Sequence, residues 1–87
     1  MTRLAIDAFA WIEYLEGSEK GTKFAAFIED DANEAFTPSA TVAEVISKVL
    51  RENKDVNVAL SHINNFSSVV ELTQDIGILA GQIHFEA

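Results

Sequence analysis

The order of short apolar runs and helical stripes constrains this chain more than any other feature. Mainly apolar runs occur at residues 4–6, 35–37 and 67–72, and short continuous runs of this kind suit buried strands. Between successive runs, apolar residues recur at three- and four-residue spacing, which is typical of helices. The sequence therefore predicts the order β-α-α-β-α-α-β-α. Strands separated by helices form a parallel sheet with right-handed crossovers, so we expect an α/β fold.

The helix boundaries follow from local signals. We expect helices over residues 8–16, 19–30, 42–53 and 56–63, and a last helix that begins at residue 73 or 74. Gly17 ends the first helix, because glycine readily takes the left-handed conformation that follows a helix. The last helix runs to the end of the chain without a stop signal. We therefore expect one domain over residues 1–87, and we interpret it as the N-terminal part of a longer fold whose last strands are missing.

The composition limits the kinds of metal site and cross-link that the chain can form. The chain has 87 residues, of which 48% are hydrophobic, which is enough for one packed domain. It contains no cysteine, so disulfides and cysteine-ligated zinc or iron–sulfur sites are excluded. With only two histidines, a bound metal must be held mainly by carboxylates, which favours Mg²⁺, Mn²⁺ or Ca²⁺.

The charge and the hydropathy pattern bear on partners and location. A net charge of −8 repels nucleic acid over most of the surface, so bound cations or a basic partner would have to supply the attraction. No apolar run approaches the roughly 20 residues that a membrane helix needs, and the N-terminus lacks the apolar core of a signal peptide. We expect a cytoplasmic protein without a membrane partner.

Asp7 is the first candidate functional residue. It closes the first apolar run in the sequence LAIDAF. In parallel sheets the ligand site lies beyond the carboxyl ends of the strands, which is where Asp7 falls. Aspartate is also a favoured helix N-cap, and a helix is predicted to begin directly after it. The residue pattern alone leaves both interpretations open.

Glu44 is the second candidate. The sequence TVAE matches a capping box between Thr41 and Glu44, and Glu44 also stands four residues before Lys48, as in a helical ion pair. Both features give it a structural explanation. However, Glu44 falls in the first predicted turn after the second strand, on the same edge of the sheet as Asp7. Two carboxylates at neighbouring strand ends can share a hard cation.

For the other conspicuous side chains, the sequence favours structural roles over functional ones. Asp75 lies in the first turn of the last predicted helix, where acids interact favourably with the helix dipole. His62 and His84 each stand alone without a second ligand at metal-binding spacing. Trp11 and Tyr14 are expected to pack in the core or at a dimer contact.

Three segments resemble PIN domains. LAIDAFAWIEYLEG is similar to the opening strand, aspartate and helix of that family, and FTPSATVAEVISKVLRE is similar to its second strand and glutamate-bearing helix. VVELTQDIGILAGQIH resembles the third strand and the following helix. The likeness is strongest to toxin-type ribonucleases of prokaryotic toxin–antitoxin pairs. It implies a three-layer α/β/α fold and a Mg²⁺- or Mn²⁺-dependent endoribonuclease in which Asp7 and Glu44 are catalytic, metal-binding acids.

The resemblance also implies partners and an alternative function. The family sheet has the order 3-2-1-4-5 and carries further aspartates after the last helix seen here. With only strands 3, 2 and 1 present, the strand that ends at Asp7 would be an unpaired edge, and such an edge invites pairing with another chain. We therefore expect a homo-oligomer or association with a missing C-terminal half, besides an RNA substrate and an antitoxin partner. The alternatives are a catalytically inactive PIN remnant that binds protein, and an unrelated α/β domain in which Asp7 is only a cap.

Overall fold

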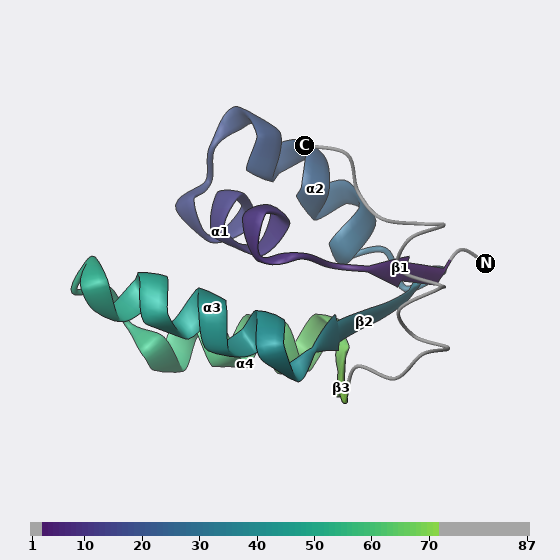
Figure 1. The fold of residues 1–87 in the computed structure, drawn as a ribbon. Helices are drawn as coiled ribbons and strands as arrows, with labels where there is room; N and C mark the ends of the chain where they lie inside the picture. Colours follow the sequence, from purple (N-terminus) through teal and green to yellow (C-terminus); the bar gives the residue numbers. More distant parts are fainter. Residues whose placement is uncertain (1–2, 72–87) are drawn as a thin grey trace.

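The structure is a computed structural model that describes residues 3–71. Within this range it contains β1 (Arg3–Ala5), α1 (Ala8–Glu16), α2 (Glu19–Ile28), β2 (Glu34–Pro38), α3 (Ser39–Arg51), α4 (Val56–Phe66) and β3 (Ser68–Val70) (Figure 1). The predicted order is confirmed as far as the third strand. The helix predicted from residue 73 or 74, with Asp75 and His84, lies outside the described residues.

The three strands form a parallel sheet in the order β1-β2-β3. Leu4 of β1 lies opposite Ala35 of β2, and Phe36 lies opposite Ser68 of β3. The Ile6 amide extends the pairing just past β1 by donating to the Phe36 carbonyl at 2.9 Å. This arrangement confirms the predicted parallel sheet and the order 3-2-1 that the family resemblance implies.

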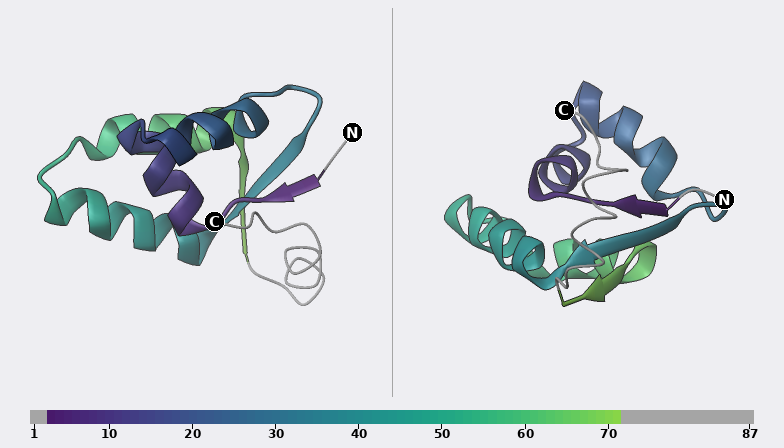
Figure 2. Two further views of the ribbon diagram at one scale, coloured as in Figure 1. Left: turned by 90° about the horizontal axis from the view of Figure 1, so that it is seen from above. Right: turned by 45° about the vertical axis from the view of Figure 1, so that its right-hand side comes forward.

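The helices of the described part share one hydrophobic core with the sheet. Both crossovers step in the same direction across the sheet, so right-handed connections place their helices against the same face. The core agrees with this, because it joins Ile6, which follows β1, and a residue of β2 to residues of the four described helices: Ala10, Trp11, Phe24, Ile28, Ala35, Val45, Val49, Ala59 and Ile63. Figure 2 shows the strands grouped at one end of the helices. The third layer of the predicted fold falls outside the described residues.

A short polar chain crosses this core. The indole N–H of Trp11 donates to the Thr37 hydroxyl at 3.0 Å, and both side chains are fully buried. The Thr37 hydroxyl lies 2.7 Å from the Ser67 hydroxyl, which in turn donates to the Ile63 carbonyl at 2.7 Å. These bonds satisfy polar groups whose burial would otherwise be costly, and they link α1, β2 and the end of α4. Trp11 is therefore a core residue, as the sequence predicts.

Tyr14 joins three helices on one side of that core. Its hydroxyl donates to Glu29 Oε2 at 2.6 Å and lies 3.1 Å from His62 Nδ1. Burial raises the pKa of the Tyr14 hydroxyl, and the neighbouring Glu29 carboxylate raises it further. The His62 ring also stacks on Phe66. The structure thus agrees with a structural role for His62.

The connection between α1 and α2 depends on two glycines. Gly17 has φ +68° and caps α1 in the left-handed conformation, as predicted. Ser18 caps α2, since its hydroxyl oxygen accepts from the Gly21 amide at 3.0 Å. Gly21 lies so close to α1 that a Cβ there would stand 1.9 Å from the Glu13 carbonyl oxygen. The close approach of the two helices therefore requires glycine at position 21.

No helix among residues 3–71 has the length and apolar character needed to cross a bilayer.

Candidate functional site

A cleft opens at the carboxyl end of the sheet, where β1 leads into α1 and β2 leads into α3. Its volume is about 430 Å³. The lining comes from α1 and α3: Ala8, Ile12, Ala43, Glu44, Ser47, Lys48 and Arg51. The cleft therefore lies at the position where parallel sheets bind their ligands.

Asp7 occupies the junction between β1 and α1. Its backbone is extended, and its Oδ1 accepts a hydrogen bond of 2.8 Å from the Ala10 amide. The predicted cap is thus present. Asp7 is half-buried and directly precedes Ala8, which lines the cleft. A carboxylate has about four acceptor sites on its two oxygens, so capping α1 is compatible with binding a metal ion.

Glu44 takes no part in the capping box that its sequence suggests. The helix α3 begins at Ser39 with Pro38 as its N-cap, and no side chain caps it. Pro38 is the last residue of β2 and has no N–H to donate to a neighbouring strand, and α3 begins directly after it, earlier than the apolar stripe indicates. Glu44 therefore lies in the second turn rather than the first, and the predicted pairing with Thr41 is wrong.

The predicted ion pair between Glu44 and Lys48 is also wrong. The Lys48 ammonium lies 3.1 Å from Glu52 Oε2, and the Lys54 ammonium lies 3.2 Å from the other oxygen of the same carboxylate. Lys48 has acids four residues away on both sides, and the structure places it toward Glu52. These two cations, Lys48 first, hold the pKa of Glu52 below its ordinary value.

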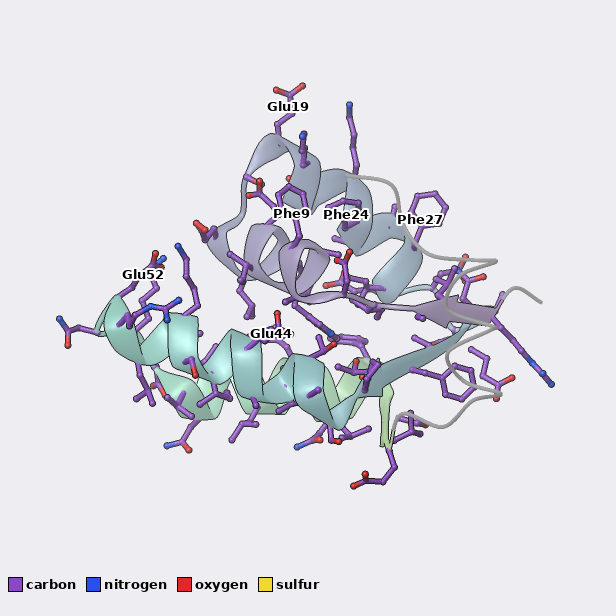
Figure 3. All side chains as sticks on the ribbon, viewed as in Figure 1. Phe9, Glu19, Phe24, Phe27, Glu44 and Glu52 are labelled. Atoms are coloured by element: carbon purple, nitrogen blue, oxygen red, sulfur yellow. The ribbon has the colours of Figure 1, made fainter. Side chains whose placement is uncertain are left out.

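Glu44 is consequently left as an exposed carboxylate that faces the cleft. Figure 3 shows it on the side of α3 that faces α1, and Ala8 and Ile12 of α1 form the opposite wall. It makes no ion pair or hydrogen bond with any residue in the range 3–71. The two structural explanations for this acid are thus removed by the structure, and Glu44 lines the same cleft as Ala8, the residue that follows Asp7.

Glu44 lines the cleft and Asp7 directly precedes Ala8 of its opposite wall, and carboxylates are the side chains that a hard divalent cation prefers. Mg²⁺ is commonly held by one or two carboxylates, with water and substrate phosphates in its other positions. No group of three or more acidic, histidine or cysteine side chains comes together among the residues that the structure describes. Two carboxylates would fill only part of the coordination sphere of such an ion.

Comparison with known families identifies the fold. The model of the PIN domain family matches residues 4–86. This chain belongs to the PIN domain family. The match extends over nearly the whole sequence, includes Asp7 and Glu44, and confirms the resemblance drawn from the three sequence segments. A PIN domain has a nuclease-type fold, and PIN domains generally depend on divalent metals. Searches of curated proteins and of solved structures returned no match.

The sequence prediction missed three polar residues of this PIN domain's cleft. Ser47, Lys48 and Arg51 line it together with Glu44. Together with Glu44 they stand at positions i, i+3, i+4 and i+7, which lie on one helix face, so the signal was present in the sequence. It could not be used without knowing that this face of α3 lies opposite α1.

Proposed function

We propose that this PIN domain is a Mg²⁺- or Mn²⁺-dependent endoribonuclease that hydrolyses RNA phosphodiester bonds at the cleft between α1 and α3. Membership of the family supports a nuclease function. The observation that carries the assignment to this cleft is the placement of Glu44, an exposed acid without a described partner, next to the strand end that carries Asp7. RNA and the metal ion are the proposed ligands.

In this proposal, Asp7 and Glu44 hold the ion from two sides of the cleft. The cap bond to Ala10 restrains the rotation of the Asp7 carboxylate, so less conformational entropy is lost when it binds. When bound, a divalent ion lowers the pKa of a water molecule and stabilises charge on the phosphate in the transition state. Its charge also offsets the repulsion between the RNA backbone and a chain of net charge −8.

The first test is Mn²⁺ binding, measured by isothermal titration calorimetry. We expect Asp7→Asn and Glu44→Gln each to weaken Mn²⁺ binding by about tenfold or more, as is usual for changes at metal sites. Asparagine caps helices about as well as aspartate, so Asp7→Asn should keep its melting temperature. Glu16→Gln is the matched control, because it removes the same charge from an exposed position in α1 that does not line this cleft. Equal Mn²⁺ affinity in Glu44→Gln and the control would contradict the assignment.

The second test is cleavage of a labelled single-stranded RNA by the same proteins. We expect cleavage that requires Mn²⁺, is abolished by EDTA and falls strongly in Asp7→Asn and Glu44→Gln. Cleavage that is unchanged in both variants would place the active site elsewhere.

A catalytically inactive PIN domain that binds protein is the second candidate. A patch of phenylalanines on α1 and α2 favours it: Phe9 and Phe27 are 38% and 50% exposed, and Phe9 packs edge-to-face on Phe24 with ring centroids 6.3 Å apart (Figure 3). Exposed apolar patches commonly mark interaction sites. The partner would be an antitoxin-like protein or a second copy of the chain. Metal-independent dimerisation, measured by light scattering and lost in Phe27→Ser, together with absent RNA cleavage, would favour this function.

A further inference from the structure

The positive charge of this acidic chain is concentrated beside the cleft. The chain has six lysines and arginines against fourteen acids. Three of the six cations, Lys48, Arg51 and Lys54, fall within seven residues at the end of α3 and the turn that follows. Acids lie among these cations, and Glu52 contacts both Lys48 and Lys54, so an approaching RNA strand would be attracted most by a cation that has no acidic partner.

Arg51 differs from the other two cations of this group. Lys48 and Lys54 both contact Glu52, which neutralises part of their charge. Figure 3 shows Glu52 near the end of α3, away from Glu44. Arg51 is exposed, lines the cleft and forms no ion pair with any residue of the described range. Among the residues that the structure describes, its guanidinium is the cation of this cleft that has no acidic partner.

The spacing along α3 relates Arg51 to the proposed metal site. Glu44 and Arg51 are seven residues apart, which is two helical turns, or about 10 Å along the axis. Both line the same cleft. A strand of RNA whose reacting phosphate lies near Glu44 would therefore carry a neighbouring part of its backbone past Arg51. A planar guanidinium can donate two parallel hydrogen bonds to one phosphate.

We propose that Arg51 binds a phosphate of the RNA backbone beside the reacting one and so sets the direction in which the strand crosses the cleft. This inference rests on the proposed function for its choice of RNA as ligand. A structural explanation also exists, because a cation in the last turn of a helix interacts favourably with the helix dipole. That explanation predicts an effect on melting temperature and none on RNA affinity.

The experiment measures the binding of a labelled single-stranded RNA by fluorescence anisotropy, with Ca²⁺ in place of Mg²⁺ or Mn²⁺, at a series of NaCl concentrations. We expect Arg51→Ala to weaken binding roughly tenfold and to reduce the slope of log affinity against log salt by about one. Arg51→Lys should restore the slope and part of the affinity, because it keeps the charge but loses the guanidinium fork. Lys23→Ala is the matched control: it removes one exposed cation from α2, outside the cleft.

The outcomes separate this inference from the proposed function. Equal affinity and salt slope in Arg51→Ala and Lys23→Ala would overturn the role of Arg51, and Mn²⁺-dependent cleavage could still stand. Binding that depends on Arg51 in a protein that never cleaves RNA would support the role of Arg51 and overturn the nuclease. No binding by the unaltered chain would overturn the role of Arg51.

Discussion

The contact between α1 and α2 provides the sharpest test of the packing in this fold. Replacing Gly21 by alanine would place a Cβ 1.9 Å from the Glu13 carbonyl oxygen and 2.9 Å from the Tyr14 amide nitrogen. Favourable contacts between heavy atoms lie near 3.5–4.0 Å, so α2 would have to move by more than about 1 Å. The obstructing atoms are backbone, which cannot turn aside as a flexible side chain can.

The size of the effect follows from two opposing contributions. Overpacking typically costs about 1–3 kcal/mol, and a clash with backbone belongs at the upper end of that range. Alanine recovers about 1 kcal/mol through its better helix propensity. We therefore expect Gly21→Ala to lower the free energy of unfolding by about 2 kcal/mol. Small domains are stable by only about 0.05–0.15 kcal/mol per residue, so this is a large part of the total.

Thermal and urea denaturation, followed by circular dichroism, measure this change. We expect Gly21→Ala to lower the melting temperature by about 10 °C. Lys23→Ala on the same helix is the control, since it is exposed and should change stability by no more than about 0.5 kcal/mol. A Gly21→Ala protein as stable as the unaltered chain would show that helix propensity outweighs the clash and would refute the close packing of α1 and α2.

Three further predictions concern stability. Trp11→Phe loses the buried hydrogen bond to Thr37 and should cost about 1–3 kcal/mol in urea denaturation; an unchanged midpoint would contradict that bond. Asp55 caps α4 through two backbone amides, so Asp55→Ala should cost about 1 kcal/mol in the same assay and Asp55→Asn almost nothing; equal losses would argue against the cap. Lys48 and Lys54 lower the pKa of Glu52 below its ordinary 4.5 in the folded state. The contribution of Glu52 to the free energy of unfolding is therefore present above pH 4.5 and is lost as the pH falls through the lowered pKa. Glu52→Gln should therefore flatten the dependence of melting temperature on pH below about 4.5, and a parallel curve would contradict this.

The order of strands and helices could be predicted from the sequence because it depends on local patterns. The period of the apolar residues distinguishes strand from helix without knowledge of the rest of the fold. The cap at Asp7 and the left-handed stop at Gly17 are equally local, since each depends on a few neighbouring residues. The same signals led to the α/β class and the parallel sheet, and the resemblance of three segments led to the family; all three are confirmed.

The environment of Glu44 was decided by tertiary structure. The local sequence predicts a capping box with Thr41 and an ion pair with Lys48 for Glu44, and neither interaction forms in the structure. Lys48 has an acid four residues away in each direction, and spacing alone gives no means of choosing between them. In the fold, Lys48 joins Lys54 at Glu52, while Glu44 lies opposite α1.

The sequence by itself thus determined which segments form strands and helices, and that Asp7 stands between the first strand and the first helix. Tertiary structure decided which residues contact one another and which line the same cleft. The close contact of Gly21 with Glu13 depends on how α1 approaches α2. The cleft that Arg51 and Glu44 line depends on how α1 approaches α3. Such approaches are set by side chains that pack through space from distant parts of the chain, and no local period or spacing records them.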